Sequence, residues 1–327
     1  MPQLNNIDVE IIRNLLRDGR ISFDELADKC RVSKNVAWKR YKSIEKRGII
    51  TGATVQINFS DFGFDALATL LISVDAQYLE QSMKIIKKIS EVRAYRQYNT
   101  VYNIRAIATL RDLNELERIK QIIKQKLPTT GLKTYIWTGV RNIPENLNLT
   151  NVTEEGTRKN KWSTSNSIEK IDQQPTIDEL DKHIVAKLAV NGRASFTEIA
   201  KQIGVSTDTV VKRYRKMRKR GSIKSSIQIN PNKIGYYSIL DFNMAFSNLG
   251  DFTPTIVESL AKIQNIIIIT KTSGEYDLQV TAMVRDITES FAIQDKISRI
   301  HGITRMEVSA RKIPFMWPTP YQYISTF

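Results

Sequence analysis

Cysteine and histidine are nearly absent from this chain. Its 327 residues include one cysteine and two histidines, His183 and His301. A single cysteine excludes an intramolecular disulfide, and with so few thiol and imidazole groups a His/Cys metal site is not expected. We therefore expect neither a metal nor another cofactor.

Long apolar runs and a secretory leader are missing as well. No stretch approaches the roughly 20 apolar residues that cross a bilayer. The first residues lack a basic segment followed by an apolar one, which is the pattern of a signal peptide. These absences predict a cytoplasmic protein with no membrane partner.

Acidic residues are outnumbered by basic ones. The chain has 49 Lys and Arg against 34 Asp and Glu, which leaves a net charge of +15. Such an excess favours a polyanionic partner, and nucleic acid is the first candidate. Ribosomal or membrane-surface binding gives the same excess, so charge alone does not decide.

The chain contains two copies of one unit. A shift of 173 positions aligns residues 8–50 with 181–223 without a gap, and many aligned residues are identical. The likeness continues more weakly, as between VQIN (55–58) and IQIN (227–230). We interpret this as an internal duplication.

The first fifty residues of each copy predict three helices. Apolar residues recur at helical spacing until Gly19 in the first copy and Gly192 in the second. Serine residues with N-cap or capping-box spacing open the next two helices. These serines are Ser22, Ser33, Ser195 and Ser206. Two helices joined by so short a turn are typical of a helix-turn-helix.

The third predicted helix of each copy is rich in Lys and Arg. In a helix-turn-helix the second helix of the pair enters the DNA major groove, and its N-terminal residues reach base edges. The side chains expected to contact phosphates are Lys39, Arg40, Lys42, Lys46, Arg47, Lys212, Arg213, Arg215, Lys219 and Arg220. Those expected to read the groove are Lys34, Asn35, Trp38 and Thr207.

Ordinary structural roles are alternatives for some of these side chains. A Lys/Arg-rich helix is often only a solvated face, although here the pattern occurs on the same helix of both copies. Trp38 covers the small helical core as readily as it contacts a base. Because Lys34 and Asn35 align with Thr207 and Asp208, the two copies should read different half-sites if both bind DNA.

The remaining hundred residues of each copy predict the order βαββαβ, which is the ferredoxin-like arrangement. In the first copy the expected strands are 66–74, 92–99, 102–110 and 132–140, with helices at 79–89 and 113–127. In the second they are 237–246, 266–272, 276–284 and 303–312, with helices at 254–263 and 287–300. The run IIIIT (266–270) is apolar on both faces, so another sheet should cover the face without helices.

The predicted fold class is therefore α+β, with winged-helix-like helix-turn-helix domains and ferredoxin-like domains. The first type is expected at 1–52 and 176–225, and the second at 53–144 and 226–313. The polar segment 145–175 has no helix or strand period and predicts a flexible linker. An aromatic and proline-rich tail follows at 314–327, which we expect to be extended and to pack on its own domain or on a neighbouring chain.

This arrangement resembles the Lrp/AsnC (feast/famine) transcriptional regulators. The likeness is carried by VSKNVAWKRYKSIEKRGII (32–50) and VSTDTVVKRYRKMRKRGSI (205–223), each followed by a βαββαβ region of the RAM type. The resemblance implies a sequence-specific regulator that binds double-stranded DNA, is not an enzyme and answers to an amino acid or another small metabolite. Because family members dimerise through their sheets, it also implies a pseudo-dimer within one chain and a homo-oligomer.

By the same resemblance, the loop between the second and third strands of the second βαββαβ region contributes to an effector site. The expected contacts are Ser273, Gly274, Glu275, Tyr276 and Asp277. Glycine allows a positive φ and close ligand approach, and free N–H groups there can bind a carboxylate. The first copy has 99–103 instead, without the glycine or the acid, and a plain hairpin turn is the alternative for the second.

Two rival functions are weighed against this one. Sirohaem decarboxylases resemble the same family and also occur as paired units, but His183 and His301 form no evident acid–base pair. A non-specific architectural DNA-binding protein would need the charge and no base contacts. A visible absorption spectrum tests the first rival, and salt-dependent binding to specific and scrambled duplexes tests the second.

Overall fold

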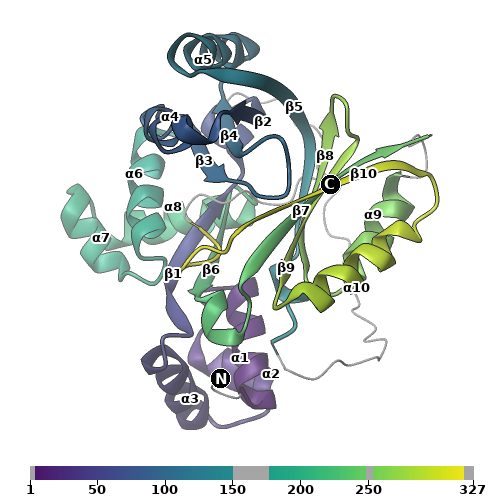
Figure 1. Cartoon of the computed structure of the whole chain (residues 1–327). Helices are drawn as coiled ribbons and strands as arrows, with labels where there is room; N and C mark the ends of the chain where they lie inside the picture. The colour runs from purple at the N-terminus through teal and green to yellow at the C-terminus, as the bar shows by residue number, and fades with distance from the viewer. Residues whose placement is uncertain (1–3, 150–176, 248–252, 320–327) are drawn as a thin grey trace. The chain divides into compact units, whose positions relative to one another are not determined.

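The structure, a computed structural model, describes residues 4–149, 177–247 and 253–319 (Figure 1). The chain forms two compact units. The helical unit consists of Met1–Asn58, Asn148–Ile234 and Phe315–Phe327, and the sheet unit of Phe59–Leu147 and Gly235–Pro314. Each unit therefore takes one part from each copy of the repeat.

Among its described residues, the helical unit has three helices from each copy. They are α1 (Asn6–Arg17), α2 (Phe23–Cys30), α3 (Lys34–Lys46), α6 (Glu179–Val190), α7 (Phe196–Ile203) and α8 (Thr207–Lys219). The predicted N-cap serines are confirmed, since each accepts a hydrogen bond from a backbone N–H in the first turn of its helix.

The capping boxes differ from the expectation in one respect. The box at Ser195 is complete, whereas at Ser22 only the serine half forms. Glu25 is instead 3.4 Å from Lys29. Complete boxes also open the first helices, where Asp8 and Asp181 occupy the third helical position. These two boxes were not among the predicted caps.

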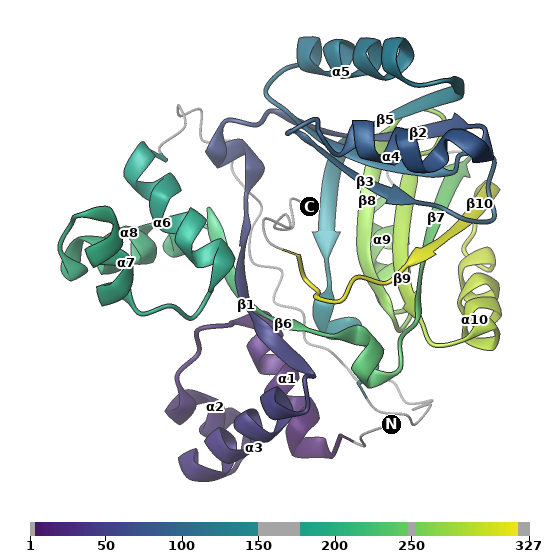
Figure 2. The same cartoon turned by 60° about the vertical axis from the view of Figure 1, so that its left-hand side comes forward.

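An antiparallel ribbon links the two copies within the described part of the helical unit. β1 (Ile50–Ile57) pairs with β6 (Ile223–Ile229), and Thr54 lies opposite Ser226. The first helix of each copy packs on the strand of the other copy, α1 on β6 and α6 on β1 (Figure 2). This ribbon was not among the predicted elements.

The beginning of the predicted tail packs in the helical unit. Trp317 is buried, and its backbone forms a bridge with Ile229 through N–H···O distances of 2.8 and 2.9 Å. The side chain of Gln228 donates to the carbonyl of Pro318. Residues 320–327 lie outside the described residues.

The sheet unit contains two βαββαβ halves, as predicted. The first half has β2 (Ala66–Val74), α4 (Leu79–Ile86), β3 (Val92–Arg96), β4 (Ile104–Leu110), α5 (Leu113–Lys126) and β5 (Thr129–Asn142). The second has β7 (Ser238–Phe246), α9 (Thr253–Ala261), β8 (Ile266–Ser273), β9 (Leu278–Val284), α10 (Ile287–Ser298) and β10 (Ile303–Lys312). Short 3₁₀ helices lie at Phe59–Phe62, Ala76–Tyr78, Pro144–Asn146 and Pro231–Ile234.

The two halves share one sheet. Over the described residues its strand order is β10-β7-β9-β8-β5-β2-β4-β3, with every neighbouring pair antiparallel. The halves also touch through side chains, since Arg105 donates to Gln279 at 2.9 Å and Gln97 donates to Ser309 at 2.8 Å. Arg105 alternates along β4 with Ile104 and Ala106, which belong to the helix-covered core, so it lies on the face without helices. That face therefore carries buried polar groups.

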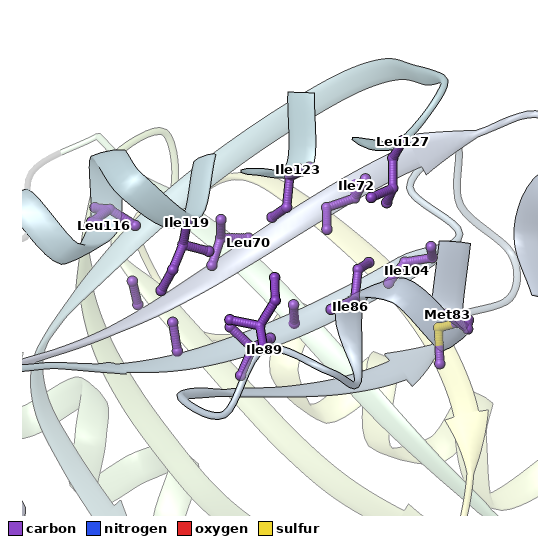
Figure 3. Close-up of a cluster of buried hydrophobic side chains, with 14 of the residues drawn as sticks. Leu70, Ile72, Met83, Ile86, Ile89, Ile104, Leu116, Ile119, Ile123 and Leu127 are labelled. Atoms are coloured by element: carbon purple, nitrogen blue, oxygen red, sulfur yellow. The ribbon is translucent and has the colours of Figure 1, made fainter. Parts of the chain in front are cut away.

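Helices α4 and α5 cover the first half with apolar side chains (Figure 3). Leu70, Ile86 and Ile119 are fully buried in this cluster. Burial of one such side chain contributes roughly 1.5–3 kcal/mol. This cluster makes the helix-covered face the core of that half.

The predicted linker is described only at its first residues. Leu147 and Leu149 are buried there, and the Asn146 amide donates to the carbonyls of Ile263 and Ile266. Residues 150–175 of that segment lie outside the described residues. Within the parts of the chain that the structure describes, no helix has the length and apolarity of a membrane span.

Candidate nucleic-acid interface

Helices α3 and α8 each present one buried and one exposed face. The buried side chains of α3 are Ala37, Tyr41 and Ile44, and those of α8 are Val210, Tyr214 and Met217. The other faces point away from this packing. Most of the side chains predicted to contact DNA are exposed: Lys34, Asn35, Trp38, Lys39, Lys42, Lys46, Thr207, Lys212, Arg215, Lys219 and Arg220.

The exposed cations fall into two groups. Lys34, Lys42 and Lys212 form ion pairs of 2.7–2.8 Å with exposed carboxylates on Asp24, Glu45 and Asp208. Such surface pairs contribute roughly 0–1 kcal/mol, so a stronger anion can replace the carboxylate. The other group has no acidic partner among the described residues, and consists of Lys39, Lys46, Arg215, Lys219 and Arg220.

Three of the predicted arginines are half-buried and pair within the chain. Arg40 and Arg47 lie 3.7 and 3.5 Å from the buried carboxylate of Asp8. In the second copy Arg213 is the counterpart of Arg40, and it pairs with Asp178 and Asp181. These ion pairs attach α3 to the beginning of α1, and α8 to the beginning of α6.

Arg213, Asp178 and Asp181 influence one another's pKa values. Burial raises the pKa of the Asp181 carboxyl, whereas a hydrogen bond from the Asp181 backbone lowers that of Asp178. The hydrogen bond to Asp178 raises the pKa of Arg213. Arg213 therefore neutralises a carboxylate that the protein interior alone disfavours.

The N-terminal ends of α3 and α8 differ in chemistry. Trp38 is 48% exposed, with the ammonium of Lys42 5.8 Å from its ring centroid, so it does not cover the core. In α8 the hydroxyl of Thr209 lies 2.8 Å from that of Ser206, beside the exposed Thr207. The two ends thus present an aromatic ring and amines in one copy and hydroxyls in the other.

Two exposed cations of α8, Lys216 and Arg218, were not among the predicted contacts, and Arg218 pairs with Asp18 at 2.9 Å. Lys216 on α8 aligns with Ser43, so it lacks a counterpart in the first copy. It is exposed and has no acidic partner in the described parts of the chain. Its place on the third helix, among basic neighbours, was the signal available in the sequence.

The predicted effector loop joins β8 to β9 in the sheet unit. Ser273, Gly274 and Glu275 are exposed, whereas Tyr276 is fully buried. The Asp277 carboxylate accepts the backbone N–H of Phe246 at 2.8 Å. Of the five predicted residues, the first three are therefore exposed, Asp277 is half-buried and Tyr276 does not reach solvent.

The loop is held by the backbone conformation of Gly274 and by the ion pairs of Glu275. Gly274 has φ +151°, and a Cβ atom there would lie 2.9 Å from the ring of Tyr135. Glu275 forms 2.6 Å ion pairs with both Lys133 and Arg305. The hydrogen bond from Lys133 holds the pKa of Glu275 below its usual range. The loop thus places one carboxylate between two cations.

Comparison with known proteins identifies relatives of the helical unit. An AsnC-type helix-turn-helix domain matches residues 177–218, and a winged helix-turn-helix DNA-binding domain matches residues 4–51. The HTH-type transcriptional regulator FL11 of Pyrococcus horikoshii is 33% identical over 128 residues, which are 39% of this chain and 83% of that protein. Ptr1 of Methanocaldococcus jannaschii, also an HTH-type transcriptional regulator, is 30% identical over 113 residues, 35% of this chain and 76% of that protein.

A solved structure resembles the chain over nearly its whole length. The siroheme decarboxylase NirDL has a TM-score of 0.63 and covers 98% of this chain and 94% of its own. Its sequence identity is 14%, so the likeness is one of fold alone.

Proposed function

The chain belongs to the Lrp/AsnC family of helix-turn-helix transcriptional regulators, and from this we propose that it regulates transcription by binding double-stranded DNA through α3 and α8. The exposed residues Lys34, Asn35, Trp38 and Thr207 read base edges, since they lie at the helix ends that enter the groove. The phosphate contacts come from the exposed lysines and arginines along the two helices.

The observation that carries this proposal is a set of exposed cations on both helices that no carboxylate among the described residues neutralises. Arg215, Lys219 and Arg220 on α8, with Lys39 and Lys46 on α3, have no acidic partner among the described residues. Phosphates are the anions that such exposed cations bind when a helix enters the major groove. Arg40, Arg47 and Arg213 hold these helices in place and contribute less to phosphate binding.

Fluorescence anisotropy with the full-length protein tests this function. The probe is a labelled duplex selected from a random pool, and a scrambled duplex serves as the comparison. With 6–10 phosphate contacts the affinity should fall roughly 10³- to 10⁵-fold between about 50 and 200 mM salt. The double variant Arg215→Ala/Lys219→Ala should reduce the log–log salt slope by about 1.8.

A matched variant controls for the loss of charge. Lys87→Ala/Lys88→Ala removes two exposed lysines from the sheet unit and should leave the slope unchanged. Equal slopes for the two double variants would contradict the proposed interface. Equal affinity for selected and scrambled duplexes would instead favour a non-specific architectural role.

We further propose that the chain is not an enzyme. Both histidines are exposed, and among the described residues no group of three or more His, Cys, Asp or Glu side chains is arranged to hold a metal. The proposal is supported by the relatives, which are HTH-type transcriptional regulators. A bound tetrapyrrole in the absorption spectrum, with decarboxylation of added sirohaem, would overturn this proposal.

The loop at residues 273–277 is proposed to bind a small carboxylate metabolite such as an amino acid. Lys133 and Arg305 already hold the Glu275 carboxylate, so a ligand carboxylate can take its place between the same two cations.

Titration calorimetry with the twenty amino acids tests the effector site. Glu275→Gln should bind a responding amino acid more tightly, because the competing carboxylate is gone. Glu117→Gln removes one exposed carboxylate from α5 and serves as the control. No heat from any amino acid, or equal affinities in both variants, would contradict this site and leave DNA binding untouched.

A further inference from the structure

The two copies in the helical unit are related by a local two-fold axis. The offset between VQIN and IQIN is 172 positions, which makes Ser226 the counterpart of Thr54. In the β1–β6 ribbon these two residues lie directly opposite each other. A residue paired with its own counterpart marks the axis of an isologous contact, the kind that usually joins two subunits.

Glycines bring the copies close together around this axis. The N–H of Gly19 donates to the carbonyl of Ser225, and the N–H of Gly192 donates to that of Ala53, at 3.0 and 2.7 Å. A Cβ atom on either glycine would lie 2.6 Å from backbone of the opposite strand. No other residue type fits at such a distance.

The arginines that follow these glycines each reach into the other copy. Arg20 donates to the carbonyls of Gly192 and Ala194 at 2.8 and 2.9 Å. Arg193, its counterpart, donates to the carbonyl of Ile21 at 3.4 Å. Each arginine therefore donates to the backbone of the other copy, and the hydrogen bonds of Arg20 are the shorter ones.

Each guanidinium also lies against an aromatic pair of the other copy. Arg20 is 4.2 Å from the ring centroid of Phe196 and 5.5 Å from that of Tyr214. Arg193 is 5.2 Å from Phe23 and 5.4 Å from Tyr41. Tyr41 and Tyr214 are buried side chains of α3 and α8 themselves. Each arginine thus connects its own copy to both the backbone and the recognition helix of the other copy.

We propose that Arg20 and Arg193 are positioning residues that hold α3 and α8 at one separation, so that one chain reads two half-sites at a single spacing. The proposal rests on the DNA-binding function given above. A planar guanidinium that donates to two carbonyls and stacks on rings resists both sliding and rotation, which a lysine ammonium does not. DNA requires such constancy, because a half-turn change of spacing turns the second half-site to the far side of the duplex.

Selection from a random pool of duplexes of about 40 bp, with room for two half-sites one helical turn apart, tests the proposal. The proteins are the wild-type chain, the double variant Arg20→Lys/Arg193→Lys and the control Arg13→Lys. All three have the same net charge. Arg13 lies on α1 and pairs with Glu10 of its own helix.

The wild type and the control should enrich two half-sites at one spacing. An insertion of about 5 bp should then lower their affinity roughly 100-fold, since the gain from linked binding is lost. The double variant should enrich the same half-sites at several spacings, and the same insertion should lower its affinity less than about 10-fold. Its affinity for a duplex with one half-site scrambled should equal that of the wild type.

A merely structural role would lower the stability of the double variant and leave its spacing preference intact, which would overturn the proposal. Variable spacing in the wild-type selection would overturn it as well. Enrichment of no sequence by the wild type would refute the DNA-binding function and this inference with it. Arg20→Lys alone should broaden the spacing more than Arg193→Lys, because Arg20 makes the two shorter hydrogen bonds.

Discussion

Replacement of Gly192 by alanine should loosen the helical unit. The new Cβ atom would lie 2.6 Å from the backbone nitrogen of Thr54, with two further backbone atoms at 2.8 Å. Backbone in a paired strand cannot rotate away as a side chain can, so α6 and β1 must separate. Separation also lengthens the hydrogen bond from the Gly192 N–H to Ala53 and that from Arg20 to the Gly192 carbonyl.

The size of the effect follows from these contacts. Overpacking of this kind costs about 1–3 kcal/mol. In hydrogen exchange limited by opening of the unit, that loss corresponds to roughly 5- to 150-fold faster exchange of the amides in β1 and β6. Exchange of peptides from the sheet unit should stay as in the wild type, so mass spectrometry of the digested protein localises the change.

Gly52→Ala is the matched control in the same ribbon. A Cβ atom there would meet only the end of the Gln228 side chain, at 3.3 Å, and that side chain can move. Its effect should stay within about 0.5 kcal/mol. If the amides of β1 and β6 exchange as slowly in Gly192→Ala as in Gly52→Ala, the two copies do not approach each other as closely as described.

Three further substitutions test other parts of the molecule. Arg213→Ala removes the cation beside the buried Asp181 and should lower the free energy of unfolding, measured in urea, by about 1–3 kcal/mol. Arg215 has no acidic partner among the described residues, so Arg215→Ala should change that free energy by less than about 0.5 kcal/mol. Equal losses would contradict the assignment of Arg213 as an internal ion pair. Burial works to raise the pKa of Asp241, but Arg311, at 2.7 Å, and Arg105 outweigh it and hold that pKa below its usual value. The charged carboxylate therefore stabilises the fold at neutral pH, and this contribution should be lost as the pH falls below about 4; Asp241→Asn should be less stable at neutral pH and flatter across that range in thermal unfolding, and an unchanged pH profile would count against it. The triple variant Lys34→Thr/Asn35→Asp/Trp38→Val gives α3 the side chains that α8 has at the aligned positions, so the two selected half-sites should become alike. Half-sites that still differ would show that the helix ends do not read them.

The helices and the order of elements were predictable from local signals. N-cap serines, glycines after the first helices and apolar spacing gave the six helices of the helical unit. Similar patterns gave both βαββαβ halves. These signals suffice because caps and amphipathic faces act within a few residues of the chain.

The grouping of the two copies was not predictable in the same way. The resemblance, and not a local pattern, implied that the two sheets associate within one chain, and the structure groups the sheets together and the helix-turn-helix parts together. The pairings that produce this grouping, β1 with β6 and β5 with β8, join residues more than a hundred positions apart. No local pattern specifies the partner of a strand, or the contacts that Arg20 makes in the other copy.

The repeat itself separates the residues that hold the helical unit together from those that we propose to read DNA. Positions with the same residue in both copies include Asp8 and Asp181, Arg40 and Arg213, and Arg20 and Arg193. All of these make internal contacts. The exposed positions at the helix ends differ, since Lys34, Asn35 and Trp38 align with Thr207, Asp208 and Val211. A dimer of identical subunits must present the same side chains twice, whereas one chain with two copies is free to change one end and keep the frame. The architecture therefore suits an operator whose two halves differ in sequence and keep one fixed spacing.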